Sequence, residues 1–366
     1  NIRFSLDNQK PYHQTEELSK EAISLLKKLI SIPSLSKEED KVCEEIHHFF
    51  SARNIKCHRK QNNIWVKNKY FDENKPVVLL NSHIDTVRPS ESWTRKPFEP
   101  TTEGNKLFGL GSNDAGGPLV SLLTAFLYFY DRETLSHNLI FAATAEEEIS
   151  GKNGISSILD ELGNIELAIV GEPTRMQMAL AEKGLMVIDA TARGESGHAA
   201  RDEGINAIYQ AIEDIQWIQG HHFPEVSPYL GEVKMTVTLI EAGTQHNVVP
   251  DTCQFVIDVR TNEHYSNRQV FEVINENTKS LLKARSFRLN PSGIRDDHPI
   301  VTCARQLNMS CFGSQTTSDQ ALMPFDSVKI GPGDSSRSHT ADEYIYMEEI
   351  EDGITKYIQL LEKLTL

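Results

Sequence analysis

The chain has 366 residues, more than one hydrophobic core usually supports, so two domains are expected. Hydrophobic residues make up 39% of it and charged residues 24%, as in an ordinary globular enzyme. The net charge of −15 argues against nucleic-acid binding, which requires a basic surface.

The cysteines and the apolar segments indicate where the protein works. Five cysteines are an odd number and include no CxxC pair, which favours a reducing compartment over a disulfide framework. Residues 1–14 lack the basic and then apolar pattern of an export signal. The longest apolar run, at 119–130, is too short to span a bilayer and predicts a buried helix. We therefore expect a cytoplasmic protein without a membrane segment.

The first half of the chain alternates between amphipathic and β-rich apolar segments. Helices are predicted near 15–30, 37–53, 118–130 and 152–161, and strands near 55–59, 62–68, 77–83, 138–144 and 166–171. Thr15 fits the cap of the first helix, and Pro33 discourages helix beyond its end. This alternation predicts a mostly parallel sheet with helices on both faces.

The pattern changes after Glu172. Strands are predicted near 184–193, 233–241 and 252–260, and helices near 204–219 and 266–284. The order β-α-β-β-α-β of such segments is typical of a small α+β sandwich. From about 293 the first pattern returns. It predicts a helix near 297–308, a strand at 326–331 and a last helix near 347–364.

We therefore predict an α/β fold of two domains. A discontinuous catalytic domain with a mostly parallel sheet comprises residues 1–178 and 293–366. An α+β two-layer sandwich, residues 179–292, is inserted into it as a lid or dimerisation domain.

Acidic and imidazole side chains stand where predicted strands end or loops begin. They are His83, Asp114, the acidic run Glu146-Glu147-Glu148, Glu172 and His339. In open α/β sheets, ligands bind outside the carboxyl ends of the strands, so we expect these side chains to converge. Two imidazoles and several carboxylates are donors that zinc accepts. Asp85, two residues after His83, can reach the ring nitrogen that faces away from such a metal.

Each position alone also has an ordinary explanation. The pair His83 and Asp85 could be a solvated loop, Asp114 a turn before a helix, and the acidic run a solvated turn. Consecutive carboxylates after a buried strand repel one another, however, and are costly without a cation. The glycine-rich loop around Asp114 lacks both common nucleotide-binding patterns.

The ordered series His, Asp, Glu-Glu, Glu, His resembles one enzyme family. This is the zinc-dependent amidohydrolase and metallopeptidase family of acetylornithine deacetylase, succinyl-diaminopimelate desuccinylase, aminoacylase and carboxypeptidase G. The resemblance covers nearly the whole chain, in NSHIDTV, GLGSNDAGG, ATAEEEISG, VGEPT, EKGLMVIDATARGESGHAA, GTQHNVVPD, DVR and SHTADEY. Within the family, GEPT, EKGLM and SHTADEY are most similar to acetylornithine deacetylases.

The resemblance implies two zinc ions per subunit, with cobalt as a substitute. His83 and Glu172 would bind one ion, Glu148 and His339 the other, and Asp114 would bridge the two. The three carboxylates supply three negative charges, so two Zn²⁺ ions would leave one net positive charge.

The resemblance also implies catalytic and substrate-binding residues. Glu147 would be the general base, Asp85 would orient His83, and His198 would contact the reacting group, usually in a partner subunit. Substrate binding would fall to Asn247, Arg260, Gly331 and Gly333.

Three details refine the resemblance. Glu146 stands where the family usually has Asp, which leaves Glu147 and Glu148 in register. Relatives hold the bridging Asp beside a cis peptide, so a cis bond between Asp114 and Ala115 is expected. Glu172 matches the deacylases and carboxypeptidases of the family, whereas aminopeptidase relatives tend to have Asp there.

The expected function is zinc-dependent hydrolysis of the amide bond of an N-acyl amino acid. The expected substrate is an N-acetyl- or N-succinyl-ornithine or -citrulline, in arginine biosynthesis. A dipeptidase, a tripeptidase or a succinyl-diaminopimelate desuccinylase of the same fold remains open, as does a non-catalytic binding protein. We expect a homodimer that acts on a small molecule and binds neither nucleic acid nor membrane.

Overall fold

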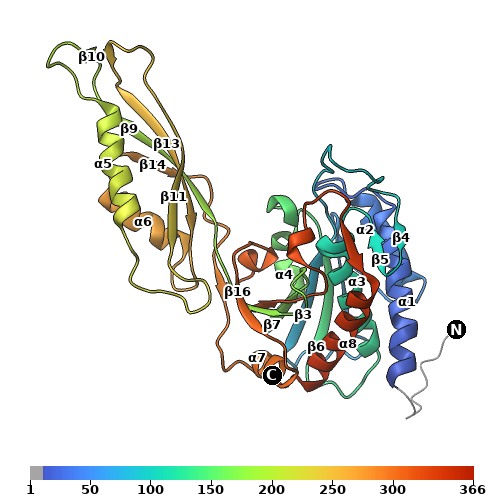
Figure 1. The fold of residues 1–366 in the computed structure, drawn as a ribbon. Helices are drawn as coiled ribbons and strands as arrows, with labels where there is room; N and C mark the ends of the chain where they lie inside the picture. Colours follow the sequence, from blue (N-terminus) through green and yellow to red (C-terminus); the bar gives the residue numbers. More distant parts are fainter. Residues whose placement is uncertain (1–10) are drawn as a thin grey trace. The chain divides into compact units, whose positions relative to one another are not determined.

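The computed structural model describes the backbone of residues 11–366 and the side chains of residues 16–366. Most of the segment considered for an export signal, residues 1–10, lies outside the described part. The chain forms two compact units, which are described separately (Figure 1). The first comprises residues up to Ala179 with Arg295–Cys311 and Met323–Leu366, and the second comprises Leu180–Ile294 with Phe312–Leu322.

The first unit is built on a sheet with the strand order β1-β2-β6-β3-β7-β17. Its strands are β1 (His58–Lys60), β2 (Asn63–Lys67), β3 (Val77–His83), β6 (Asn138–Thr144), β7 (Leu167–Val170) and β17 (Asp326–Lys329). The central four, β6, β3, β7 and β17, are parallel. Every residue of β3, β6 and β7 is buried, which explains their continuous apolar sequences. This confirms the predicted α/β class.

Helices cover this sheet. They are α1 (Pro11–Ile30), α2 (Asp40–Ser51), α3 (Gly117–Phe129), α4 (Leu159–Leu162), α7 (Pro299–Gln306) and α8 (Met347–Lys363). The central helix α3 packs against α1, α8, β3 and β6, and most of its residues are buried (Figure 1). The apolar sequence of α3 is therefore explained by burial inside the protein, as predicted, and not by insertion into a membrane.

A small three-stranded sheet joins distant parts of the first unit. Its strands are β4 (Thr101–Glu103), β5 (Lys106–Phe108) and β18 (Tyr344–Tyr346), in the order β18-β5-β4. A tight loop, Ser112–Gly116, connects β5 to α3, and the backbone angles of Asp114 and Ala115 within it are not helical. The peptide bond between Asp114 and Ala115 in this turn is cis, as expected. The sheet thus places the segment that follows His339 beside the loop that carries Asp114.

The second unit contains an antiparallel sheet with the order β11-β13-β9-β14. Its strands are β9 (Met186–Arg193), β11 (Lys234–Ala242), β13 (Thr252–Arg260) and β14 (Leu281–Ala284). Helices α5 (Ala207–Gly220) and α6 (Asn267–Asn277) lie on one face of it (Figure 1). Alternate residues of β9 are buried there, as in a sheet with one covered face. The chain order is the predicted β-α-β-β-α-β.

Short strand pairs complete the second unit. β10 (Gly197–His198) pairs with β12 (Val248–Val249), and β15 (Ser292–Gly293) pairs with Ala181 and Glu182 of β8 (Met178–Glu182). Strand β16 (Cys311–Ser314) also pairs with β8.

Three predicted helices differ from the structure. The first is already helical at Pro11, where the described part of the chain starts, ahead of the expected cap at Thr15. The helix expected at 152–161 is a 3₁₀ turn followed by the single turn α4. The helix expected at 266–284 ends at Asn277, and β14 follows, because the Asp214 carboxylate binds the N–H groups between them.

The segment 312–322 falls within the range predicted for the catalytic domain but packs with the second unit. The carboxylate of Glu182, which is fully buried, accepts hydrogen bonds from the backbone N–H and the hydroxyl of Ser318, at 2.8 and 2.7 Å. Gly313 lies against the carbonyl of Tyr229, leaving no room for a side chain.

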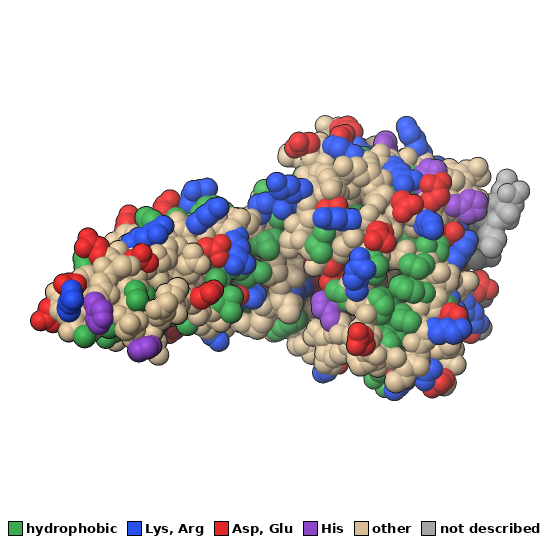
Figure 2. Space-filling view, turned by 90° about the horizontal axis from the view of Figure 1, so that it is seen from above, with side chains coloured by type: hydrophobic (Ala, Val, Ile, Leu, Met, Phe, Trp, Pro, Cys, Tyr) green, Lys and Arg blue, Asp and Glu red, His purple; other side chains and the backbone are tan. Residues whose placement is uncertain are grey.

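The structure also describes the cysteines, the apolar helices and the charged surface. All five cysteines are free thiols, and burial raises the pKa of Cys43 to about 11, as is usual for structural thiols. Within the described residues, no helix has both the length and the apolar character that crossing a membrane requires. Acidic and basic side chains are interspersed on the face that Figure 2 displays.

Candidate metal centre and active site

Side chains from separate segments of the first unit meet beyond the carboxyl ends of its parallel strands. They are His83 at the end of β3, Asp114 in the loop Ser112–Gly116, Glu148 in the 3₁₀ turn after β6, Glu172 after β7, and His339 after the 3₁₀ turn Ser335–Arg337. Because β6, β3 and β7 are parallel, their last residues lie at one edge of the sheet.

The donor atoms form two groups that share Asp114. In one group are His83, Asp114 and Glu172, and in the other are Asp114, Glu148 and His339; within each, one atom per residue lies within 4.8 Å of the others. His83 Nε2 is 3.2 Å from Asp114 Oδ1, and His339 Nε2 is 3.6 Å from Asp114 Oδ2. Each group therefore offers one imidazole nitrogen and two carboxylates, with one oxygen of Asp114 facing each imidazole.

The electrostatics of this cluster favour bound cations. Burial raises the pKa of Glu172 to about 8, and the nearby Asp114 carboxylate adds to the effect. A hydrogen bond to Glu148 raises the pKa of His339 to about 9. Burial lowers the pKa of His83, but hydrogen bonds to Asp114 and Asp85 outweigh it and leave the pKa well above its ordinary value. The cluster thus binds protons where no metal supplies positive charge, and its nitrogen and oxygen donors suit zinc.

Asp85 contacts more of the site than His83. The Nδ1 atom of His83 lies 2.9 Å from the main-chain carbonyl of Asp85 and 3.3 Å from its Oδ1. Since both oxygens accept, Nδ1 must donate, which leaves Nε2 free to bind a metal. The same carboxylate accepts hydrogen bonds from the Ser36 hydroxyl, at 2.7 Å, and from the N–H groups of Glu147 and Glu148, at 3.0 and 3.2 Å. Asp85 therefore fixes both His83 and the acidic turn.

Glu147 borders the cluster without joining the two groups that share Asp114. Its Oε2 lies 3.9 Å from His83 Nε2, and its side chain is only 13% exposed. Glu147 also forms a compact group with His83 and Glu148. A carboxylate in this place can accept a proton from a water that reacts between the two metal-binding groups.

The glycine loop 331–333 closes one side of the site. A β-carbon at Gly331 would lie 2.5 Å from the carbonyl oxygen of Glu172, and one at Gly333 would lie 2.6 Å from Asn113 Oδ1. Gly333 also has a φ of +90°, which a side chain would strain. Only glycine therefore allows this loop to approach both Glu172 and the loop before Asp114.

Two buried glutamates that the sequence prediction did not assign hold loops of the site. Glu39 Oε1 accepts the N–H groups of Lys37 and Glu146, at 2.7 and 3.2 Å. Glu343 accepts N–H groups of the loop that carries Asp114. Burial raises the pKa of Glu343 to about 8. The only sequence signal for either was the position of Glu343 inside SHTADEY.

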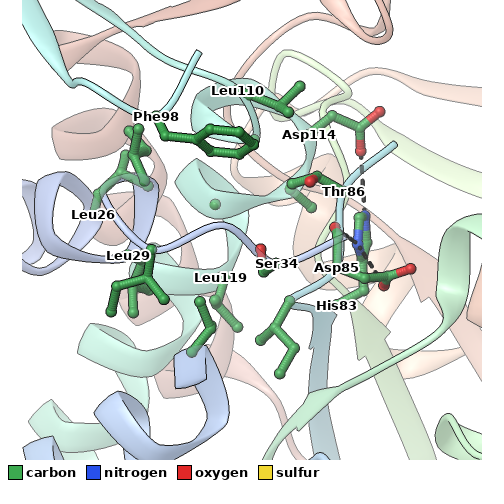
Figure 3. A pocket seen from close by; sticks show the side chains of 17 residues that line it. Leu26, Leu29, Ser34, His83, Asp85, Thr86, Phe98, Leu110, Asp114 and Leu119 are labelled. Carbon is green, nitrogen blue, oxygen red and sulfur yellow. Dashed lines mark hydrogen bonds and ion pairs between the residues drawn. The ribbon is translucent and has the colours of Figure 1, made fainter. Parts of the chain in front are cut away.

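An apolar pocket lies behind His83 and Asp114 (Figure 3). Leu26, Leu29, Phe98, Leu110 and Leu119 form its wall, and the Thr86 hydroxyl is buried there without a hydrogen-bond partner among the described residues. Its volume of about 30 Å³ can hold a water molecule but not an amino acid. The pocket is therefore too small to receive an amino-acid substrate.

The remaining predicted residues belong to the second unit. His198 pairs with Val248 across the β10–β12 sheet, and the Asn247 carbonyl accepts the N–H of Ala199, so His198 and Asn247 are neighbours. Arg260 ends β13, and its guanidinium binds the Asp258 carboxylate at 2.8 and 3.1 Å. Strand β13 therefore separates Arg260 from His198 and Asn247.

Comparison with known proteins identifies relatives over most of the chain. A profile of peptidase family M20/M25/M40 matches residues 79–363. The acetylornithine deacetylase of Proteus mirabilis strain HI4320 is 29% identical over 315 residues, which cover 79% of this chain and 80% of that protein. The succinyl-diaminopimelate desuccinylase of Orientia tsutsugamushi strain Ikeda is 25% identical over 273 residues, 70% of each protein.

A solved structure supports the same fold. The aminopeptidase PepT of Bacillus cereus ATCC 10987 covers 94% of this chain and 98% of its own, with a TM-score of 0.74 and 17% identity. At that identity the likeness concerns the fold alone.

The affinity of the metal-free protein for zinc is expected to rise between pH 7 and about 9. Glu172 and His339 hold protons with pKa values of about 8 and 9, and a metal must displace them. Below those values, affinity should rise about tenfold per pH unit for each proton displaced. Calorimetry with chelator-buffered zinc, in buffers of different ionisation enthalpy, measures both the affinity and the protons released. A constant affinity with no proton release would show that neither group binds metal.

Proposed function

Since the chain belongs to peptidase family M20/M25/M40, we propose that it hydrolyses the amide bond of an N-acyl amino acid with two zinc ions. The family consists of metal-dependent hydrolases, so the chain is an enzyme rather than a non-catalytic binding protein. The observation that carries the proposal is the pair of donor groups that share Asp114, with the Glu147 carboxylate beside them.

The donor set fits two divalent cations. His83 and Glu172 would hold one, Glu148 and His339 the other, and Asp114 would bridge them, as the two groups of donor atoms suggest. Bound zinc polarises a substrate carbonyl and lowers the pKa of a water to about 7. Cobalt accepts the same nitrogen and oxygen donors and would substitute.

The protein side chains then handle the protons. Glu147 would accept a proton from the attacking water and deliver it to the departing amine nitrogen. Asp85 would keep Glu147 in place, because its carboxylate binds the N–H of that residue. Water itself attacks the carbonyl, so the reaction needs no acyl-enzyme.

The relatives and one site residue favour an N-acyl-ornithine as substrate. The Proteus relative is an acetylornithine deacetylase, which would place this enzyme in arginine biosynthesis. Glu172 supports deacylation over aminopeptidase activity. Arg260 would bind the substrate α-carboxylate through its two-pronged guanidinium, sharing it with Asp258. The five free cysteines support a cytoplasmic location.

A panel of substrates tests this proposal. N-acetyl-, N-succinyl- and N-formyl-amino acids, dipeptides and tripeptides would be assayed with zinc or cobalt. We expect the highest kcat/KM for an N-acyl-ornithine or N-acyl-citrulline. Faster hydrolysis of N-succinyl-diaminopimelate would identify a desuccinylase, and faster hydrolysis of free peptides would identify a dipeptidase or tripeptidase.

Variants of the acidic turn separate catalysis from metal binding. Glu147→Gln cannot accept a proton, so turnover should fall about 10²–10⁴-fold while bound metal stays constant. Glu148→Gln should instead lose metal affinity, because Glu148 belongs to a donor group. Metal analysis and steady-state kinetics compare them. The reverse result would place the roles one residue out of register, and two active, metal-bound variants would refute the mechanism.

The second unit gives two reasons to propose a homodimer. His198 and Asn247 lie beyond the Thr252 end of β13, whereas Arg260 is its last residue. Eight residue steps along a strand span about 27 Å, so one substrate cannot reach both ends of one chain. If both ends contact substrate, His198 and Asn247 must come from a partner subunit.

The second reason is exposed apolar surface. Leu239 and Ile240 on the edge strand β11 are 64% and 57% exposed, and Tyr209 on the adjacent helix α5 is 66% exposed. Hydrophobic side chains lie among charged ones on the face of this unit in Figure 2. An unpaired strand edge with apolar side chains is suited to pairing with a second copy.

Sedimentation of two leucine variants tests the dimer. Leu239→Arg should yield monomers with little activity, because the partner's contribution to the site is lost. Leu281→Arg is the matched control: Leu281 is also 64% exposed, on β14 at the opposite sheet edge, and this variant should stay dimeric and active. A fully active wild-type monomer would contradict the proposal.

A further inference from the structure

The side chain of Glu343 is hydrogen-bonded to the loop that carries Asp114. It is 2% exposed and immediately precedes β18. Its Oε1 accepts the N–H groups of Asn113 and Asp114, at 2.8 and 2.9 Å, and its Oε2 accepts the N–H of Gly111, at 3.0 Å. Both carboxylate oxygens are thus directed at the main chain, so Glu343 acts on the loop rather than as a metal ligand.

The main chain of Glu343 and the residues on either side of it are also held by hydrogen bonds. The carbonyl of Glu343 accepts the N–H of Gly109 at 3.0 Å, and the next residue, Tyr344, pairs with Phe108 of β5. Asp342, the preceding residue, accepts the N–H groups of Thr94 and Arg95 at 3.0 and 2.9 Å. Glu343 is therefore itself held on a fixed segment and can define the position of the loop.

The position of this loop matters because Asp114 must serve two donor groups at once. Its Oδ1 lies 3.2 Å from His83 Nε2, and its Oδ2 lies 3.6 Å from His339 Nε2. A shift of the Asp114 main chain toward one group would withdraw the carboxylate from the other. One of the three hydrogen bonds of Glu343 binds the N–H of Asp114 itself.

We propose that Glu343 is a positioning residue that sets the metal affinity of the site by fixing the main chain of the bridging residue Asp114. The inference rests on the proposed two-metal function. His339, which supplies a donor, and Glu343, which positions the bridge, lie four residues apart on one segment. That segment therefore contributes to both donor groups.

Glu343→Gln tests the proposal, with Asp214→Asn as a matched control. Asp214 is also a buried carboxylate, 3% exposed, and it also accepts N–H groups of a loop, from Lys279 and Ser280 at 2.9 and 2.8 Å. Asp214 belongs to the second unit and to neither donor group. Both substitutions replace one carboxylate oxygen with an NH₂ group that cannot accept an N–H. Zinc affinity against a competing chelator, Tm of the metal-free protein, and kcat and KM at saturating zinc would be measured.

Both variants should have a lower Tm than the wild-type protein. Only Glu343→Gln should bind zinc about 10–100-fold more weakly, which is the usual effect of removing a group that orients a metal ligand. Its kcat should fall more than its KM changes, because Glu343 contacts the Asp114 loop rather than substrate. Wild-type zinc affinity in Glu343→Gln, with only Tm reduced, would overturn the proposal.

A shorter side chain covers the case in which Glu343→Gln does not fold. Glu343→Asp keeps the carboxyl group but lacks one methylene and cannot reach all three N–H groups. It should also bind zinc more weakly, and wild-type affinity would overturn the proposal. Zinc binding by the wild-type protein distinguishes a failure of the proposed function from a failure of the inference about Glu343. If it binds no zinc, the proposed function fails together with this inference; if it binds zinc and both variants match it, only the inference fails.

Discussion

The crowding of carboxylates at one edge of the parallel sheet is the constraint on which the rest of the first unit depends. Asp114, Glu147, Glu148 and Glu172 share a small volume with two imidazoles. Burial, together with the nearby Asp114 carboxylate, raises the pKa of Glu172, and the hydrogen bond to Glu148 raises the pKa of His339. Such a cluster is stable only if positive charge compensates it and if its loops cannot move apart. The proposed metals meet the first requirement, and the surrounding main chain meets the second.

The loops of the site are held by a second set of buried carboxylates that bind backbone N–H groups. Asp85 binds the turn of Glu147 and Glu148, Glu39 binds the N–H of Glu146, and Glu343 binds the loop of Asp114. A carboxylate that accepts N–H groups is well solvated by the protein itself. Acidic residues therefore have two separate roles here: one set faces the centre of the site, and the other fixes the loops from behind.

The sequence predicted the strands of the site well because each buried strand is a continuous apolar run. The predicted limits of β3 and β6 agree with the structure, and His83 stands at the predicted end of β3. The sequence predicts helix where β14 lies, because four residues at a sheet edge carry no clear hydrophobic period. The sequence does not reveal that Glu39 and Glu343 hold loops of the site. Their carboxylates accept backbone N–H groups 107 and about 230 residues away, and the sequence pattern carries no mark of such a main-chain partner.

The topology of the first unit has a consequence for the order in which the protein is made. Strand β17, the fourth parallel strand, pairs with β7 but is encoded after the whole second unit. His339 and Glu343 come later still. The ribosome therefore synthesises the acidic residues Glu146–Glu148 and Glu172 long before His339 and Glu343. Between the synthesis of Glu172 and that of His339, the nascent chain therefore carries an incomplete set of metal donors.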